Sequence, residues 1–442
     1  MSAVSRRQFR PSLPGPTGAI DDSAPWSLPR AGFPVDERHA AISIRDLAGR
    51  GLTVSTGDVI LPALAVVESA LDRNLRIIAA FAEARGCLLA PHSKTTMSPW
   101  LMRRQLDLGA WGMSVASVAQ AAVAFTAGAS KIFVANVVVG TQDHIWIAKN
   151  ARDGVGQLLS QVDSPEAVQI LDRGLGLAGH PSRHEVLVEV GAPGGRTGAR
   201  NREGAVRVAR AVAASTHLAL AGVSTYEGVV GHDRRAETLA RIDAHLDGVR
   251  TTLVELRDLG LFADSGRAIV SSGGTRYLDR AVERLAPGHW GLADVDLLVR
   301  PGSYAMGGDG LTADDTWFAG PDAPPAERLT AALEAWADVL AVPEVGLAIV
   351  GIGKKHVGER PKAILPSRVV RRDGQSTGIV GRSAIAGVDD QHTYLRFDGP
   401  ALHVGDRVAF VVGYPASLEP WRTVLVVDDE RRVTDAFATA FA

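Results

Sequence analysis

The chain has 442 residues, of which 46% are hydrophobic and 22% charged, and its formal net charge at pH 7 is −2. That length exceeds what one hydrophobic core usually fills, so two domains are expected, one of them possibly a barrel of about 250 residues. The small net charge argues against nucleic acid or a membrane surface as partner and favours a small molecule. A single cysteine, Cys87, excludes an internal disulfide and any zinc site that needs two thiolates.

Residues 1–40 are rich in Pro, Gly and Ser and show no apolar periodicity. This composition predicts an extended arm that takes no part in catalysis. The arm lacks the continuous apolar segment of a secretory signal. No run in the chain approaches the ~18 to 20 apolar residues of a membrane-spanning helix. We therefore expect a cytoplasmic protein.

From Leu61 onward, segments of helical period alternate with short apolar runs. Apolar residues at three- and four-residue steps from Leu64 to Ile78 predict a helix that ends at Gly86, with a strand following at 87–90. Further strands are predicted at 112–115, 132–139, 185–190, 218–223, 268–271 and 295–299, with helices such as 100–107, 117–127 and 235–259 between them. The alternation predicts a parallel sheet, and the number of units favours a closed barrel over an open sheet.

After Pro324, one more predicted helix at 326–339 precedes a change to β-like sequence. Short apolar runs at 346–350, 367–370, 393–397, 407–412 and 422–427 are separated by Gly, Pro and Asp. The expected fold is therefore α/β: an arm at 1–40, a parallel (β/α)8 TIM-like barrel at 41–320, and a C-terminal all-β domain at 321–442.

Lys94 lies in the segment PHSKT at 91–95, directly after a predicted barrel strand. In parallel barrels the active site lies at this end of the strands. Desolvation by the barrel wall would lower the pKa of the lysine, so that its neutral amine can attack an aldehyde and form an imine. An ordinary surface lysine is the competing interpretation, because lysine is normally exposed.

Short motifs continue in order to the end of the chain. They are PHSKT at 91–95, Gln105, GAWG at 109–112, AN at 135–136, Glu189 with GRTG at 195–198, YEG at 226–228, SSGGT at 271–275, RPGSY at 300–304, DQH at 390–392 and VVDD at 426–429. Together they resemble the D-serine dehydratase and D-threonine aldolase family, in particular its amino-acid deaminase members, which are fold-type III enzymes related to alanine racemase. The resemblance implies pyridoxal 5'-phosphate (PLP) bound to Lys94 as a Schiff base, an amino-acid substrate and a homodimer.

The glycine-rich motifs supply most of the predicted cofactor site. Its members are Lys94, Arg196, Tyr226, Ser272, Gly273, Gly274, Thr275, Gly302, Ser303 and Tyr304. Glycines let backbone N–H groups turn toward a phosphate while hydroxyls add donors, and the loops after the last barrel strands often hold phosphate. The two loops should therefore converge. Competing interpretations are a tight turn for the glycines, a surface ion pair for Arg196 and a core aromatic for Tyr226.

The sequence departs from the family where its members hold a divalent metal. The family has a His-x-Cys or His-x-Asp motif before a tryptophan-containing segment, whereas here Tyr414 and Ala416 precede Trp421. Alanine cannot coordinate a metal, and a neutral phenol is a poor zinc ligand. We therefore expect no metal there and expect Tyr414 to act as an acid or base on the cofactor face opposite Lys94.

Two histidines complete the set of candidate catalytic residues. His92 lies two residues from Lys94, so on an extended strand both side chains would share a face, and His92 would tune the imine or shuttle a proton. A structural histidine that orients the strand end is equally compatible. His356, in GIGKKH at 351–356, is a candidate replacement group where relatives often have Asp, and with His392 it is the alternative source of a metal site.

The resemblance implies a PLP-dependent lyase for a D-amino acid, most simply a β-hydroxy one, through retro-aldol cleavage or through dehydration and deamination. An amino-acid racemase or epimerase is the alternative, for which the two domains and Tyr414 would suffice. A non-catalytic PLP-binding protein would lack the β domain, and a sugar-phosphate barrel enzyme would leave the later motifs unexplained.

Overall fold

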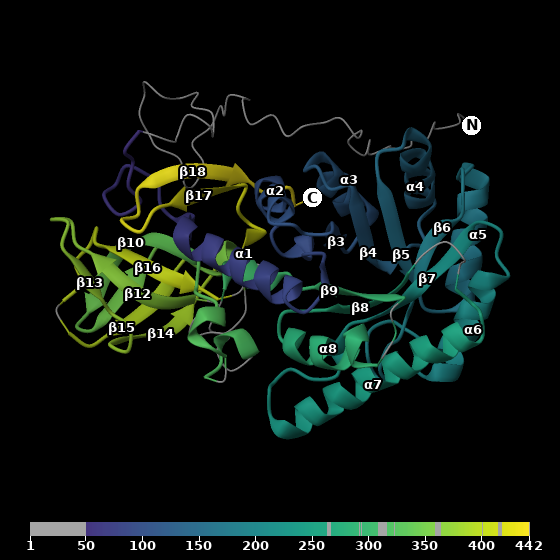
Figure 1. The fold of residues 1–442 in the computed structure, drawn as a ribbon. Helices are drawn as coiled ribbons and strands as arrows, with labels where there is room; N and C mark the ends of the chain where they lie inside the picture. Colours follow the sequence, from purple (N-terminus) through teal and green to yellow (C-terminus); the bar gives the residue numbers. More distant parts are fainter. Residues whose placement is uncertain are drawn as a thin grey trace, which may run out of the picture.

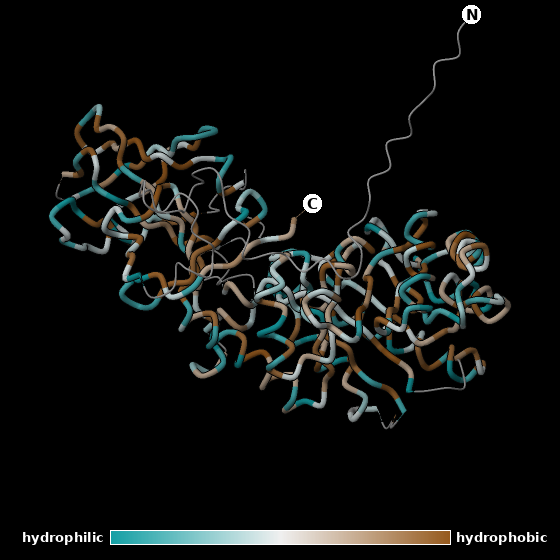
Figure 2. Tube along the Cα trace, turned by 90° about the horizontal axis from the view of Figure 1, so that it is seen from above, coloured by the Kyte–Doolittle hydropathy of each residue, from teal (hydrophilic) through white to brown (hydrophobic). Residues whose placement is uncertain are grey.

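The computed structural model describes residues 50–262, 267–290, 292, 294–307, 316–321, 323–358, 364–399, 401–413 and 418–441. The arm predicted at 1–40 lies outside them. The described chain forms two lobes that lie side by side, a barrel surrounded by helices and a β-rich lobe (Figures 1 and 2). No described helix is both long enough and apolar enough to cross a membrane.

The first lobe is a barrel of eight parallel strands in the order β2-β9-β8-β7-β6-β5-β4-β3. The strands are β2 (Leu88–Leu89), β3 (Met113–Val115), β4 (Lys131–Val137), β5 (Gln157–Val162), β6 (His184–Glu189), β7 (Leu218–Thr225), β8 (Ala268–Gly273) and β9 (Val295–Arg300). The backbone N–H of Trp111 donates to the Leu89 carbonyl at 2.8 Å, and that of Ser114 to the Pro91 carbonyl at 3.0 Å. These bonds join β3 to the end of β2 and close the barrel, which confirms the predicted fold class.

The barrel helices lie on the outside of the sheet (Figure 1). They are α2 (Pro99–Asp107), α3 (Val118–Thr126), α4 (Thr141–Asp153), α5 (Pro165–Ala178), α6 (Arg202–Ala213), α7 (Ala236–Asp258) and α8 (Leu278–Leu285). Helices α2, α3, α5 and α6 each follow a residue whose side chain accepts a hydrogen bond from a backbone N–H of the first turn: Ser98, Ser117, Ser164 and Asn201. Such caps satisfy otherwise unpaired donors. They also fix the loops that leave the C-terminal ends of the strands.

The second lobe is a β-sheet lobe built mainly from C-terminal strands. They are β10 (Leu333–Glu344), β11 (Leu347–Val350), β12 (Ile364–Val370), β13 (Ser376–Gly378), β14 (Ser383–Val388), β15 (Thr393–Phe397), β16 (Arg407–Val412), β17 (Thr423–Val427) and β18 (Val433–Ala438), with the short helix α9 (Lys354–Val357) between β11 and β12. One strand comes from far earlier in the chain: β1 (Ala63–Val67) pairs antiparallel with β10 and parallel with β17. Helix α1 (Glu68–Glu83) then leads from this sheet to the barrel.

Two of the predicted helices are wrong in part or whole. Leu64 and Val67 belong to strand β1, so helix α1 begins only at Glu68. The helix predicted at 326–339 is instead largely strand β10, which has sheet neighbours on both edges. A strand that is buried on both faces reads as a continuous apolar run, and its period does not separate it from a buried helix.

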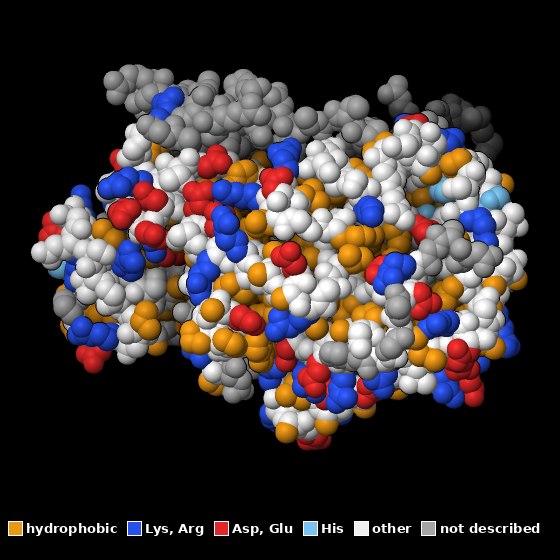
Figure 3. Space-filling model, in the orientation of Figure 1, with side chains coloured by type: hydrophobic (Ala, Val, Ile, Leu, Met, Phe, Trp, Pro, Cys, Tyr) orange, Lys and Arg blue, Asp and Glu red, His pale blue; other side chains and the backbone are white. Residues whose placement is uncertain are grey.

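Buried contacts hold the two lobes together. The side chain of Asn74 is fully buried, and its amide donates to the carbonyls of Thr330 at 2.7 Å and Ala305 at 3.1 Å. The Trp100 ring stacks on Phe437 with 4.9 Å between centroids. On the face shown in Figure 3, acidic and basic side chains are interspersed, as the small net charge leads one to expect.

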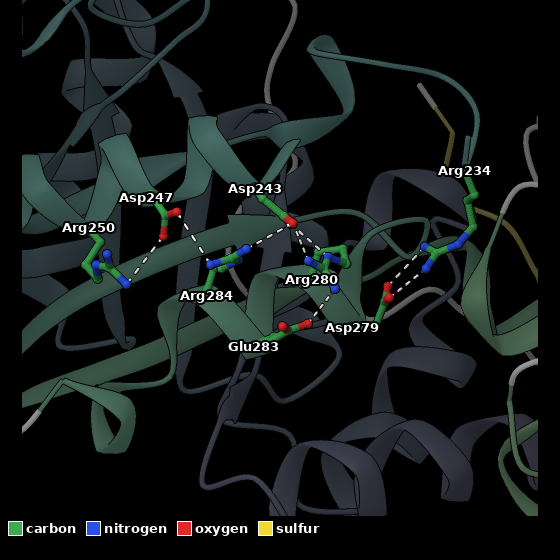
Figure 4. A network of polar contacts seen from close by, with 8 residues as sticks. All are labelled: Arg234, Asp243, Asp247, Arg250, Asp279, Arg280, Glu283 and Arg284. Carbon is green, nitrogen blue, oxygen red and sulfur yellow. Dashed lines mark hydrogen bonds and ion pairs between the residues drawn. The ribbon is translucent and has the colours of Figure 1, made fainter. Parts of the chain in front are cut away.

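A network of ion pairs links α7 to α8 (Figure 4). Asp243 on α7 accepts hydrogen bonds from Arg280 and Arg284 on α8, with Arg280 Nε at 2.8 Å and Arg284 Nη2 at 3.1 Å. The Asp243 side chain is only 14% exposed. Burial raises the pKa of this carboxyl, but the hydrogen bonds and charges of the two arginines outweigh burial and lower it. The network therefore stabilises the packing of α8, which follows strand β8.

We predict that Asp243→Ala lowers the free energy of unfolding at pH 7 by about 2 kcal/mol, because two half-buried guanidinium groups lose a charged acceptor. Because the folded-state pKa is depressed, this contribution is present above the unfolded pKa of about 3.9 and is lost as the pH falls through the folded value. Urea denaturation of both proteins between pH 7 and pH 3 measures the difference.

Asp153→Ala is the matched control, since its pair with Lys149 is largely exposed. Exposed pairs contribute about 0.5 kcal/mol or less. Equal losses in the two variants, or a loss in Asp243→Ala that does not shrink under acid, would contradict the role given to this network.

Candidate active site

A cavity of about 670 Å³ lies at the C-terminal ends of the barrel strands. Nine of the predicted site residues line it: His92, Lys94, Arg196, Tyr226, Gly273, Gly274, Thr275, Gly302 and Ser303. They come from the ends of β2, β6, β7, β8 and β9 or from the loops that follow, so the barrel brings together residues that are far apart in the sequence. Function-bearing residues of parallel barrels concentrate at this end.

Lys94 lies in a short 3-10 turn, Ser93–Thr95, a few residues after β2 ends at Leu89. The turn is fixed on both sides: the backbone N–H of His92 donates to the Pro301 carbonyl at 3.0 Å, and Thr95 Oγ1 donates to the His92 carbonyl at 2.7 Å. The side chain of Lys94 reaches solvent in the cavity, yet the surrounding protein desolvates it and lowers its pKa. The charges of Arg196 and Arg300 lower the pKa further.

His92 lines the same cavity, although the expectation of an extended strand through Lys94 is wrong because the chain turns at Ser93. The Nδ1 atom of His92 is buried and has no hydrogen-bond partner among the described residues. Burial holds the pKa of His92 well below its usual range, and the charges of Lys94, Arg300 and Arg196 act in the same direction. The imidazole is therefore neutral at pH 7.

The glycine loops after β8 and β9 meet at one wall of the cavity. Ser303 Oγ lies 3.0 Å from Thr275 Oγ1, which places two hydroxyl groups side by side. A Cβ atom at Gly302 would lie 2.7 Å from Thr95 Oγ1 and 2.8 Å from the His92 carbonyl, so only glycine fits against the lysine turn. Gly274 has φ of +104°, a conformation that L-residues rarely adopt. Hydroxyls and turned backbone of this kind suit a phosphate group.

Two charged residues at the base of the cavity were contained in the sequence motifs but were given no role. Arg300 is 4% exposed, donates from Nη1 to Ser271 Oγ at 2.7 Å and from Nη2 to the Thr225 carbonyl at 2.8 Å, and leaves a buried Nε without a partner. Burial lowers the pKa of Arg300 to about 10. Glu227 is 1% exposed, and burial raises its pKa to about 7 although Ser272 Oγ donates to it at 2.7 Å.

The remaining predicted site residues are placed elsewhere. Ser272 donates to Glu227, and the buried phenol of Tyr304 accepts from Gln105 Nε2 at 2.9 Å, so neither is among the residues that line the cavity. His356 lies in the second lobe, where its ring accepts the Gly353 N–H at 3.1 Å and lies 5.9 Å from the Trp421 ring. Tyr414 and Ala416 lie outside the described residues, so the expected loss of the metal ligands stays a prediction.

The donor set of the cavity fits PLP. A lysine with a lowered pKa suits the aldehyde, and the glycine loops with Thr275 and Ser303 suit the phosphate. Buried polar atoms without partners, Nε of Arg300 and Oε2 of Glu189, belong to residues that line the same cavity. Because buried polar groups are normally hydrogen-bonded, these atoms indicate that the cavity is built to take a polar ligand.

Comparisons with known proteins show which proteins this chain is similar to. Residues 332–427 match the family model described as a putative serine dehydratase domain. The chain is 28% identical over 215 residues to a D-threonine aldolase from Arthrobacter sp. and 27% identical over 216 residues to a 3-hydroxy-D-aspartate aldolase from Paracoccus denitrificans (strain Pd 1222). Each alignment covers 48% of this chain and about half of the relative, 55% and 54% respectively.

The fold likeness extends over more of the chain. The crystal structure of D-threonine aldolase from Filomicrobium marinum superposes with a TM-score of 0.71 at 26% identity, covering 86% of this chain and 95% of that one. Fold, motif order and the match of the C-terminal lobe thus point the same way. Together they show that this chain is similar to D-threonine aldolases and 3-hydroxy-D-aspartate aldolases and carries a serine dehydratase-like domain, in line with the resemblance of its motifs.

Proposed function

We propose that this protein is a PLP-dependent lyase that acts on a β-hydroxy D-amino acid, by retro-aldol cleavage or by dehydration. The observation that carries the proposal is the position of Lys94, whose amine has a lowered pKa and lines the same cavity as the two glycine loops. The relatives named D-threonine aldolase and 3-hydroxy-D-aspartate aldolase support the reaction class.

The chain's own residues would hold PLP at two ends. Lys94 Nζ would hold the aldehyde end, since its lowered pKa raises the fraction of neutral, nucleophilic amine. The adjacent hydroxyls of Thr275 and Ser303, with the backbone at Gly274, would hold the phosphate end. When bound, PLP supplies an electron sink for charge that develops at the substrate Cα.

Arg300 and Glu227 form the rigid floor of this site. Ser271 and the Thr225 carbonyl hold the Arg300 guanidinium in one orientation, so its Nε–H is a fixed donor under the cavity. Ser272 fixes the Glu227 carboxyl in the same way. A fixed donor and a carboxyl that titrates near neutrality orient a polar ring without needing to reorganise during the reaction.

Retro-aldol cleavage requires a base for the β-hydroxyl proton while the Cα–Cβ bond breaks, and an acid that returns a proton to Cα. Lys94 Nζ and the neutral His92 imidazole are the two groups of the described chain that we assign to these transfers. Dehydration uses the same pair, with the proton taken from Cα and a proton delivered to the departing hydroxyl. Tyr414 stays a predicted acid on the opposite face.

A panel of D- and L-amino acids, with detection of aldehyde, keto acid and enantiomer exchange, tests the proposal. We expect aldehyde or keto acid from a β-hydroxy D-amino acid such as D-threonine or D-serine, and we expect Lys94→Ala to lower turnover at least about 10³-fold, because attachment point and base are lost together. Because Tyr414 and Ala416 are poor ligands, activity should survive a chelator. Enantiomer exchange without aldehyde or keto acid would instead establish the racemase alternative, and full activity in Lys94→Ala would contradict the lyase assignment.

A homodimer and a cytoplasmic location also stay predictions.

Gly274→Ala should weaken PLP binding at least about tenfold, because an L-residue resists φ of +104° and its Cβ would lie 2.9 Å from Glu227 Oε1. Fluorescence titration of the apo protein measures the dissociation constant. Gly154→Ala is the matched control: it also has positive φ, +63°, but its Cβ meets nothing within 4 Å. The control should lose stability of about 1 kcal/mol and keep its affinity. Equal affinity in the two variants would mean that the loop after β8 is only a turn.

A further inference from the structure

A glycine-rich loop, residues 191–200, joins β6 to the start of α6 at the rim of the cavity. Its glycines are needed for its close fold. A Cβ atom at Gly191 would lie 2.2 Å from the Thr197 carbonyl, and one at Gly198, where φ is +96°, would lie 2.4 Å from the Gly191 nitrogen. The loop therefore doubles back on itself in a way that other residues would prevent.

Arg200 holds this folded loop from within. Its Nη1 atom donates to the carbonyls of Ala192 at 2.9 Å and Thr197 at 3.0 Å, and its Nη2 atom donates to those of Gly195 at 2.9 Å and Arg196 at 3.1 Å. One guanidinium thus ties together four carbonyls of its own loop. The rigid fork of arginine suits such a task, which an ammonium group on a flexible stem cannot reproduce.

Two further hydrogen bonds anchor the loop to the barrel. Thr197 Oγ1 donates to Glu189 Oε1 at 3.0 Å, and the Gly198 N–H donates to Asp163 Oδ2 at 3.2 Å. Glu189 ends strand β6, and Asp163 directly follows β5. The conformation of the loop is therefore set before any ligand arrives, which lowers the entropic cost of binding.

What this loop presents to the cavity is the side chain of Arg196. Within the described ranges no hydrogen bond or ion pair engages its guanidinium, which lies 5.4 Å from the Tyr226 ring centroid. Beside it, Glu189 is 5% exposed, and its Oε2 atom is buried without a partner. Arg196 and Glu189 both line the cavity. Among the described residues, then, an arginine that makes no hydrogen bond and a buried carboxylate oxygen without a donor lie in the same wall.

This wall is separate from the glycine loops that suit a phosphate. Those loops follow β8 and β9, whereas Arg196 follows β6, and β7 lies between β6 and β8 in the barrel. The guanidinium fork binds a carboxylate through two parallel N–H···O bonds. A substrate amino acid that PLP would hold through its amino nitrogen would still have its α-carboxylate available for such a contact.

We propose that residues 191–200 form a preformed clamp for the substrate's α-carboxylate, in which Arg196 binds the carboxylate and Arg200 is a positioning residue that holds Arg196 in place. The proposal rests on the proposed function. The charge of Arg196 acts on the Glu189 carboxyl, although no hydrogen bond joins the two side chains. Arg196 is assigned here to the substrate, whereas the sequence led us to expect it at the cofactor.

The test compares the most rapidly processed amino acid of the panel with its α-amide, which lacks the negative charge. Arg196→Met should lower kcat/KM for the acid by about 10- to 100-fold, the size of a charged hydrogen bond, and leave the amide nearly unchanged. Arg200→Ala should lower the acid-to-amide ratio about tenfold, mainly through KM, and Arg200→Lys should not restore it. The double variant should be no worse than Arg196→Met, and PLP affinity should stay within twofold.

Arg202→Ala is the matched control, because this neighbouring arginine is exposed and pairs with Glu255 outside the cavity. It should keep the wild-type ratio. The clamp is refuted if Arg200→Ala lowers kcat/KM for the acid and for the amide equally, or if the losses of the two single variants add in the double variant. It is also refuted if Arg196→Met weakens PLP binding, because Arg196 would then bind the cofactor. Failure of the proposed function would appear in the wild type itself, as no turnover of any amino acid on the panel.

Discussion

The site depends on the way in which the end of strand β2 is held between its two neighbours. Its backbone bonds to β3 through Leu89 and Pro91 close the barrel, and the bond from His92 to the Pro301 carbonyl ties it to the chain that follows β9. The turn that carries Lys94 begins where this pairing ends. Because the backbone is satisfied on both sides, the lysine has a fixed origin, and the glycine loops of β8 and β9 meet it across the cavity.

The charged side chains of the cavity then determine which kind of ligand it can bind. Arg196, Arg300 and Lys94 line one cavity. Burial is the main cause of the lowered pKa values of Lys94 and His92, and the charges of Arg196 and Arg300 lower both further. Two carboxyls, Glu189 and Glu227, lie in the same walls with raised pKa values, mainly because they are buried. An excess of positive charge in a desolvated cleft attracts a ligand with several negative charges. A phosphorylated cofactor together with an amino-acid carboxylate has this character.

The sequence predicted those elements whose structure is determined by residues close together in the chain. Apolar runs located seven of the barrel strands, but β5 was missed because Gln157, Ser160 and Gln161 interrupt its apolar pattern. Strand β1 was read as helix since its partners, β10 and β17, lie more than 260 residues away in sequence. The structure brings Lys94 and the glycine loops of the motifs together in one cavity. The motifs did not reveal Arg300 and Glu227 as its floor, because a motif does not show which side chain turns inward.

The central claim is that Lys94 is the covalent attachment point of PLP, and borohydride reduction tests it most directly. Reduction of the PLP-loaded protein followed by peptide mass analysis should place one phosphopyridoxyl group on the peptide that contains Lys94. The absorbance band of the bound cofactor should be lost at the same time. Modification of a different lysine, or no bound cofactor after incubation with PLP, would contradict the account.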